Sequence, residues 1–297
     1  MRHSHRIAGA LAVGVTAALA LSACGSGSSG SPAAPHAHSA TAADAALVAT
    51  LPAAVKAKGT LVVGVDATYA PNEFLGPDGQ TVEGMDVDLF NAVAGELGLR
   101  VTWVPAPFDS IIDGVNSGKY DLGVSSFSVT PDRLKQVDMV TYFTAGTEWA
   151  AAKGNPKHVN LADACGLPIA VQEATTQADD IAARSRACTH AGHPAIKVTT
   201  YSGQDQATVS VVSGKNVAML ADSPIAAYAI KSTHGKLQQI GSIYDSAPYG
   251  YVVPKKNAAL AQAIAGALKK LRASGAYKRT LDKWGSASGG ISTFAVK

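Results

Sequence analysis

The feature that most constrains this fold is a regular alternation of apolar runs and helical periodicity. Residues 61–66 (LVVGVD) indicate a buried strand. Residues 86–98 follow a Gly/Pro/Asn-rich loop and place Phe90, Val93 and Leu97 on one helical face, with acidic residues in the first turn and a glycine at the stop. RVTWVP, FDSIIDGVNSG and YDLGVSSF repeat the scheme. This order predicts an α/β fold with a parallel sheet.

A second series of the same kind begins at Gly166. Its predicted strands cover residues 166–173, 197–201 and 216–222, and its predicted helices lie at about 176–187, around 205–214 and after 222. The chain then adds a strand at 250–254 and two amphipathic helices, the first with one apolar stripe of Leu260, Ile264, Leu268 and Leu271. A chain of 297 residues is longer than one core usually serves, so we expect one large domain or two lobes.

An internal repeat relates the two series. The segment VNSGKYDLGVSS (residues 115–126) aligns without a gap on VVSGKNVAMLAD (residues 211–222). Ser126 and Asp222 therefore end equivalent strands of two similar lobes. Open α/β sheets bind ligands just beyond the carboxyl ends of their strands, so two such edges facing each other predict a ligand cleft.

The N-terminal region has the layout of an export signal. A basic start (MRHSHR) precedes an apolar run at residues 7–21, which is short for a membrane span and is followed by small residues. LSAC, ending at Cys24, resembles a bacterial lipobox, which implies a signal peptide at 1–23 and a lipidated Cys24 that holds the protein on the membrane surface. The alternative is an apolar segment that merely contains a cysteine. The Gly/Ser/Pro/Ala/His-rich stretch after it predicts a flexible tether, assigned to residues 24–50.

Charge and cysteine content fit an exported protein. Without residues 1–23 the chain keeps 23 basic and 22 acidic residues, a net charge of +1 that argues against a nucleic-acid partner. With Cys24 lipidated, Cys165 and Cys188 remain, and in an exported protein they predict a disulfide, with two free buried thiols as the alternative. No histidine spacing accompanies them, so we expect no metal site.

Polar and aromatic side chains gather at the predicted strand ends. They comprise one fixed cation, two carboxylates, hydroxyls, an amide and two rings, contributed by Asp66, Tyr69, Phe108, Ser126, Ser128, Arg133, Gln172, Thr175, Thr176 and Asp222. An arginine among hydroxyl and amide donors is a bidentate receptor for a carboxylate, and a separate carboxylate suits an ammonium. The combination predicts a site for a zwitterion, which is an α-amino acid.

Each of these residues also has an ordinary structural interpretation. Thr130 and Pro131 form a typical helix start, after which Arg133 would be a solvated charge. Asp66 and Asp222 could cap the helices that follow them, and the two aromatic residues could belong to the core or the surface. Only their joint placement at strand ends favours a binding site.

The chain from about Lys58 to Trp284 resembles the solute-binding proteins of ABC importers for polar amino acids. The likeness is carried by LVVGVDATYAPNEF, GMDVDLFNAVAGELG, FDSIIDGVNSGKYDLGVSSFSVTPDR, IAVQEATTQADDIA, NVAMLADSPIAAY, YGYVVPKKN and LKKLRASGAYKRTLDKW. It implies a two-lobed periplasmic-binding-protein-like fold of type II, with two crossing strands as the hinge near residues 143–149 and 246–251. The last two helices would then pack on lobe 1.

This resemblance also implies boundaries and partners. Lobe 1 would comprise residues 51–145 and 248–297, and lobe 2 residues 146–247. The protein would be a lipid-anchored extracytoplasmic monomer without a cofactor, which binds an L-amino acid and delivers it by hinge closure to an ABC permease.

Matching residues acquire roles from the resemblance. It implies that Arg133 clamps the ligand's α-carboxylate with help from Ser128 and Thr176, and that Asp222 and Ser126 receive the α-ammonium.

The ligand's side chain would lie between Tyr69 and Phe108 and end near Asp66 and Gln172. Some relatives carry a charged residue where Gln172 stands, but Asp66 favours arginine, lysine, histidine or glutamine over an acidic ligand. Glu73 either adds to that preference or faces solvent.

Two other functions remain open. A few dehydratases of cyclic amino-acid precursors share the architecture, but the nearest acid, Glu173, follows an inward-facing residue and so should point away from the cleft. A ligand-sensing accessory lipoprotein is the other alternative, although neither a membrane span nor a signalling domain is expected after Lys297.

Overall fold

The computed structural model describes residues 43–297. The predicted signal peptide at 1–23, the lipidation at Cys24 and most of the predicted tether lie outside these residues. Among the described residues, no helix combines the length and the apolar character needed to cross a bilayer.

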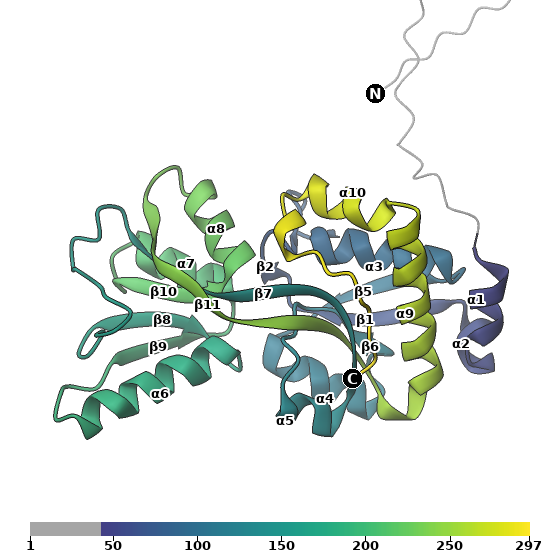
Figure 1. Ribbon diagram of the computed structural model, residues 1–297, viewed down its shortest axis with the longest axis horizontal. Coiled ribbons are helices and arrows are strands. Elements are labelled where there is room, and N and C mark those ends of the chain that lie inside the picture. The colour runs from purple at the N-terminus through teal and green to yellow at the C-terminus, as the bar shows by residue number, and fades with distance from the viewer. Residues whose placement is uncertain (1–42) are drawn as a thin grey trace, which may run out of the picture. The chain divides into compact units, whose positions relative to one another are not determined.

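One eight-stranded sheet runs through the described part of the chain (Figure 1). Its strand order is β5-β1-β6-β11-β7-β10-β8-β9. The strands are β1 (Thr60–Val65), β5 (Arg100–Pro105), β6 (Leu122–Gly123), β7 (Asp138–Ala152), β8 (Pro168–Gln172), β9 (Lys197–Tyr201), β10 (Ala218–Asp222) and β11 (Leu237–Val253). A second, three-stranded sheet contains β2 (Thr68–Tyr69), β3 (Glu73–Leu75) and β4 (Val82–Glu83).

The helices lie around these sheets. They are α1 (Ala45–Thr50), α2 (Ala53–Lys58), α3 (Met85–Glu96), α4 (Ile111–Ser117), α5 (Pro131–Gln136), α6 (Thr176–His190), α7 (Gln204–Val212), α8 (Ser223–Ser232), α9 (Ala258–Ala273) and α10 (Ala276–Lys283). Short 3-10 turns η1 (Phe108–Ser110), η2 (Lys255–Asn257) and η3 (Ala287–Gly289) complete the set.

Strand direction divides the large sheet into two lobes. In lobe 1, β1 pairs in parallel with β5 and β6, and in lobe 2, β8 pairs in parallel with β9 and β10. The long strands β7 and β11 pair antiparallel with each other and continue from one lobe into the other (Figure 1). The predicted α/β fold with two lobes and two crossing strands is confirmed.

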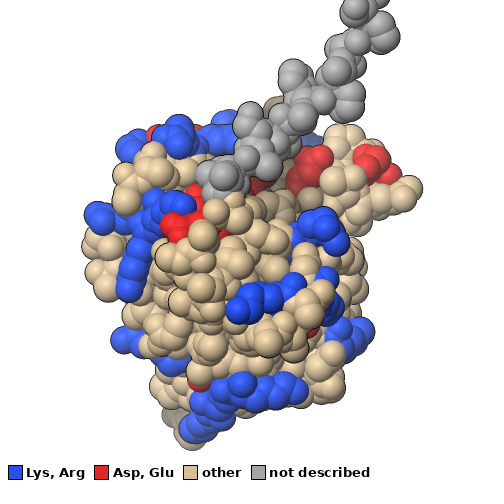
Figure 2. Space-filling model, turned by 90° about the vertical axis from the view of Figure 1, so that its right-hand side faces the viewer, with Lys and Arg blue, Asp and Glu red and all other residues tan. Residues whose placement is uncertain are grey.

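Each lobe has its own hydrophobic core. In lobe 1, Leu260, Ile264 and Leu268 of α9 are fully buried against a core that contains Phe90 of α3 and Tyr251 of β11. The predicted stripe on α9 is therefore the face that packs on this lobe. Figure 2 shows the face of lobe 1 turned away from lobe 2, where basic side chains are separated by uncharged surface.

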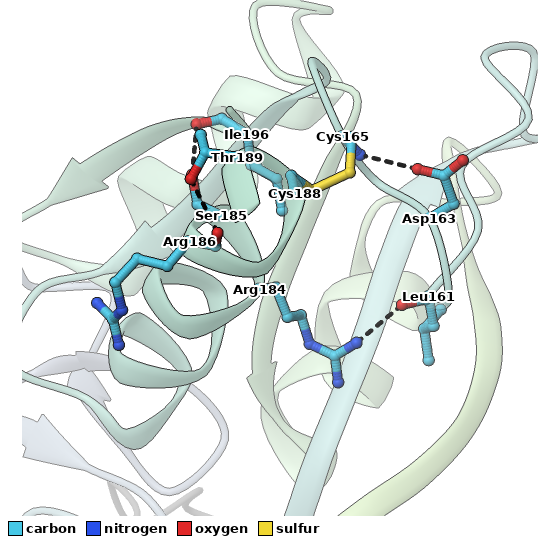
Figure 3. Close-up of a disulfide and its surroundings, with 9 residues drawn as sticks. All are labelled: Leu161, Asp163, Cys165, Arg184, Ser185, Arg186, Cys188, Thr189 and Ile196. Atoms are coloured by element: carbon cyan, nitrogen blue, oxygen red, sulfur yellow. Dashed lines mark hydrogen bonds between the residues drawn. A yellow bond between two sulfur atoms is a disulfide. The ribbon is translucent and has the colours of Figure 1, made fainter. Parts of the chain in front are cut away.

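The predicted disulfide is present in lobe 2 (Figure 3). Cys165, in the loop before β8, is bonded to Cys188 near the end of α6, with their Cα atoms 5.7 Å apart. Cys188 is buried in the lobe 2 core beside Ile181 and Ile196. The bridge thus fixes the end of α6 to the loop that leads into the sheet.

The predicted tether is wrong in its last residues, because Ala45–Thr50 forms helix α1. The carboxylate of Asp44 accepts the backbone N–H groups of Ala46 and Leu47 at 2.9 and 3.2 Å, which satisfies donors that a helix start leaves free. Leu47 packs against the lobe 1 core, and Asp44 also lies 2.9 Å from the Lys270 ammonium. Local capping and tertiary packing outweigh the polar composition of the preceding stretch.

Candidate functional site

A narrow cavity lies between the strand ends of the two lobes. All the predicted ligand residues except Asp66 line it, together with two residues that the sequence did not single out. The lining residues are Tyr69, Phe108, Ser125, Ser126, Ser128, Arg133, Gln172, Thr175, Thr176, Gln177 and Asp222. Both lobes contribute side chains to this lining, so the cavity lies at their junction.

Arg133 enters the cavity from the first turn of α5. Thr130 caps this helix by accepting the Arg133 backbone N–H at 3.3 Å, and Pro131 occupies the first helical position. The guanidinium donates to the carbonyl oxygen of Ser128 at 2.9 Å and, in lobe 2, to that of Ala174 at 3.1 Å. Burial lowers the pKa of Arg133, but a guanidinium stays charged at any physiological pH. Arg133 is therefore both a residue of an ordinary helix start and the cation of the cavity.

The start of α6 faces Arg133 from the other lobe. Thr175 caps the helix by accepting the Ala178 N–H at 3.1 Å, and Thr176 begins it. The first N–H groups of a helix and its dipole favour an anion. A carboxylate placed here meets Arg133 on one side and the α6 N-terminus on the other.

Asp222 supplies negative charge in lobe 2. It precedes α8, but its side chain makes no capping hydrogen bond there. Its carboxylate instead accepts the Tyr69 hydroxyl at 2.8 Å and the Gln177 side-chain amide at 2.9 Å. Burial raises the pKa of Asp222. The structure therefore argues against a capping role for this side chain and directs it into the cavity.

Asp66 lies just behind the cavity wall. It is 3% exposed, and its carboxylate accepts the Thr68 hydroxyl at 2.9 Å and the side-chain amide of Gln172 from lobe 2. Burial raises the pKa of Asp66 to about 6. The sequence placed Asp66 beside Gln172, and the structure brings the two together, although only Gln172 reaches the cavity surface.

The aromatic residues form walls of the cavity. Tyr69 is 6% exposed and Phe108 is 9% exposed, and both line it. Phe108 stacks on Phe127 with ring centroids 4.5 Å apart, and the Arg133 guanidinium carbon lies 5.3 Å from each of these two rings. The two aromatic residues thus serve core packing and line the cavity at once.

A buried acidic layer supports the serine end of the cavity. Glu73 is fully buried and accepts the hydroxyls of Ser125 and Ser126 at 3.4 and 3.3 Å, so it does not face solvent. Asp86 accepts the Ser126 backbone N–H at 3.2 Å and the Tyr142 hydroxyl. Burial raises the pKa of Glu73 well above its usual range and that of Asp86 to about 6.

Three of these residues were missed by sequence reasoning. Gln177 is the second residue of α6 and directly follows the predicted site residue Thr176. This place in the first turn of a helix that begins at the cavity was the signal that could have identified it. Ser125 sits beside a predicted site residue on a sharp turn. Asp86 had no such signal, because its carboxylate looks like an ordinary first-turn acid of α3. Glu173 does not line the cavity, as strand alternation suggested.

Residues 43–297 contain no cluster of side chains suited to a metal ion. No group of three or more His, Cys, Asp or Glu side chains there is arranged to hold an ion. The cavity lining offers charged and polar groups that can make charge-assisted hydrogen bonds.

Comparison with known proteins places this geometry in context. The bacterial extracellular solute-binding proteins, family 3, match residues 61–287. The arginine-binding protein ArgT of Corynebacterium glutamicum is 33% identical over 242 residues, which cover 81% of this chain and 79% of that protein.

Two solved structures share the fold. The structure of an ancestral arginine-binding protein bound to arginine matches with a TM-score of 0.70 and 32% identity over 76% of this chain and 98% of the other. The ancestral amino acid-binding protein AncCDT-1, described as a precursor of cyclohexadienyl dehydratase, matches with a TM-score of 0.68 and 32% identity, covering 78% of this chain and 97% of the other.

Proposed function

The chain belongs to family 3 of the bacterial extracellular solute-binding proteins, and on that basis we propose that it binds a polar L-amino acid and delivers it to an ABC importer. The observation that carries this proposal is the pairing across one cavity of Arg133 and the α6 N-terminus with Asp222. Arg133 and the α6 N-terminus suit an α-carboxylate, and Asp222 suits an α-ammonium. Ser128 and Thr176 complete the carboxylate end, and Ser126 the ammonium end.

The ligand's side chain lies between Tyr69 and Phe108 and is polar, with a basic side chain preferred. Its end approaches Gln172 at the cavity wall and Asp66 just behind that wall. Arginine is the first candidate, since several relatives are named for it, and lysine, histidine and glutamine follow.

Delivery rests on hinge closure between lobe 1 (residues 51–145 and 248–297) and lobe 2 (residues 146–247). The partner is a membrane permease, to which the closed protein brings its ligand. A lipidated Cys24 holds the monomer at the outer face of the membrane through the stretch before α1. No cofactor takes part.

Binding rather than catalysis is supported by the cavity's own groups. A cyclic-precursor dehydratase needs an acid at the reacting bond, and the carboxylates here are engaged by donors: Asp222 by Tyr69 and Gln177, and Asp66 by Thr68 and Gln172. Glu173 lies outside the cavity lining.

A ligand screen tests the proposal. Residues 25–297 are tested by thermal shift and calorimetry against each of the proteinogenic L-amino acids, with mass spectrometry of the ligand after incubation. We expect binding of arginine and a few polar amino acids and recovery of unchanged ligand. No response to any amino acid would contradict the proposal, and a changed ligand would favour the enzyme.

Substitution of the carboxylate clamp tests the assigned geometry. Arg133→Ala should weaken every bound amino acid by roughly 30-fold or more, because loss of a buried charge partner costs about 2–5 kcal/mol. Lys135→Ala is the matched control, since Lys135 is an exposed cation on the same helix. Near wild-type affinity of the Arg133 variant would remove that residue from the site.

A further inference from the structure

A second hollow, here called the hinge groove, has a volume of about 460 Å³ and shares no lining residue with the amino-acid cavity. Its floor is the hinge strand β7, with residues 143–146 and Glu148. One wall is α8 of lobe 2, which contributes Tyr228 and Lys231, and the other is the loop after α10 of lobe 1, which begins at Trp284. Figure 1 shows α8 of lobe 2 and α10 of lobe 1 both above the crossing strands, one toward each end of them.

Glu148 is the unusual residue of this groove. It is 3% exposed and lines the groove from the middle of β7, opposite Ala221 of β10. No hydrogen bond or ion pair reaches its carboxylate from residues 43–297, and burial alone raises its pKa to about 7. Its oxygens are not among the fully buried side-chain atoms that lack a partner, so the carboxylate opens onto the groove, where a bound cation can pair with it.

Other buried acids of the described chain differ from Glu148 in this respect. Asp66, Glu73, Asp86 and Asp222 each accept hydrogen bonds from protein groups, and Glu96 lies 2.8 Å from the Lys270 ammonium. Each of those carboxylates therefore has at least one protein partner. Glu148 has none among the described residues.

The rest of the groove narrows the chemistry of its ligand. A Ca²⁺ ion needs about six to eight oxygen ligands, and the groove offers one carboxylate. Its walls include apolar side chains that are exposed without a protein partner, Tyr228 at 39% and Ile243 at 48%. Lys231, at the rim, is exposed and disfavours multiply charged cations. A single positive charge on an apolar body fits these features.

We propose that the hinge groove is a second binding site, which takes a small organic monocation whose primary ammonium pairs with Glu148 and whose chain or ring rests on the apolar walls. The site is independent of the proposed amino-acid function, because the two cavities have no residue in common.

Phenethylamine is the probe, titrated by calorimetry into residues 25–297 that have been saturated with arginine. Arginine keeps the probe out of the main cavity, and if arginine does not bind, the titration is run without it. We expect saturable binding of phenethylamine and none of the isosteric neutral phenethyl alcohol. Equal binding of the alcohol, or no binding of the amine, would overturn the proposal.

The amine should bind roughly tenfold more tightly at about pH 8 than at about pH 6, because only the ionised carboxylate pairs with it. The other titratable side chains lining the groove are Tyr228 and Lys231 of α8, and the neighbouring Asp222 of β10 lines the other cavity. Affinity that is constant or falls over this range would count against the ion pair.

Variants locate the effect. Glu148→Gln should weaken phenethylamine at least tenfold and remove its pH dependence, while the matched control Glu173→Gln, a glutamate outside both cavities, changes neither. Ala227→Trp places a ring in the groove at an exposed position and should block the amine without touching the carboxylate. Thermal melts confirm folding. Wild-type affinity in both Glu148→Gln and Ala227→Trp would refute the site.

Discussion

Around the amino-acid cavity, buried carboxylates outnumber cations. Asp66, Glu73, Asp86 and Asp222 are each at most 5% exposed, and Arg133 is the cation among the lining residues. Burial raises the pKa of each of these acids, so protons hold part of the negative charge. A cationic ligand that displaces such protons gains electrostatic attraction to the ionised carboxylates, which a neutral ligand does not. This favours arginine or lysine at this site.

Asp66 should make both folding and the binding of a cationic ligand depend on pH. Its pKa of about 6 in the folded protein lies above its ordinary value of 3.8, so the folded protein holds this proton more tightly than the unfolded chain. Asp66 therefore makes folding less favourable as the pH rises from about 4 to about 6. A cationic ligand pairs with the ionised form, so its affinity should fall as the pH drops through about 6.

Asp66→Asn should weaken arginine by roughly 30-fold or more near neutral pH, by loss of a buried charge partner, and should reduce the pH dependence of binding. Calorimetry with arginine and with neutral glutamine measures both effects, and glutamine should be affected far less. Asp113→Asn, an exposed acid on α4, is the control. Equal losses for both ligands would mean that Asp66 supports the fold rather than selecting the charge.

Residue types were predictable where a motif and a strand end coincided. Arg133, Ser128 and Asp222 follow recognisable strands, and the structure brings them to one cavity. The acidic layer was not predictable, because Glu73 and Asp86 are far apart in sequence and meet only around Ser126. That serine adopts a left-handed φ of 50°, held by hydrogen bonds from and to buried side chains, which a periodic pattern does not encode.

At the scale of elements, two helix starts point at one place. Thr130 caps α5 and Thr175 caps α6, and both helices present their first turns to the cavity from opposite lobes. A cap fixes where a helix begins and therefore where its first side chains point. Each threonine is thus a positioning residue.

The disulfide is an element-scale constraint on lobe 2. It closes a 23-residue separation, for which chain entropy predicts about 3 kcal/mol of stabilisation. The double variant Cys165→Ser/Cys188→Ser should have a free energy of unfolding lower by about 3 kcal/mol, seen as a lower urea midpoint. It should still bind arginine, because neither cysteine lines the cavity.

Wild-type protein in reductant is the control for this measurement and should match the double variant. Alkylation followed by mass spectrometry without reductant should find neither thiol free. Identical urea midpoints for the oxidised protein and the double variant would contradict the entropic contribution.

Elements with strong periodicity were predicted well, and elements created by pairing were not. Strand β9 and the stripe of α9 appear where expected. Residues 237–245 of β11 were not identified as a strand, because much of this stretch is polar and exposed, and its extended form comes from the ladder with β7. Helix α1 was missed for a related reason, since contacts with lobe 1 stabilise it.

At the scale of the whole molecule, the lobes meet through direct hydrogen bonds. The Gln204 N–H donates to the Thr68 hydroxyl at 3.1 Å, and the Tyr69 hydroxyl donates to Asp222 at 2.8 Å. Arg133 reaches Ala174 in the same way. These contacts cross from lobe 1 to lobe 2, while only β7 and β11 connect the lobes covalently within the large sheet. The architecture therefore permits hinge motion with a defined closed state.

A ligand shifts such an equilibrium only by what it gains in the closed state over the open one. An amino acid spanning Arg133 and Asp222 gains both contacts only when the lobes meet, so arginine should shorten the distance across the cleft mouth. Spin labels at Asp109→Cys and Gln206→Cys, exposed positions in lobe 1 and lobe 2, report that distance by pulsed electron paramagnetic resonance. Labels at Asp109→Cys and Lys119→Cys, both in lobe 1, should not respond, and Arg133→Ala should abolish the shift. One unchanged distance distribution with and without bound arginine would exclude closure as the response to ligand.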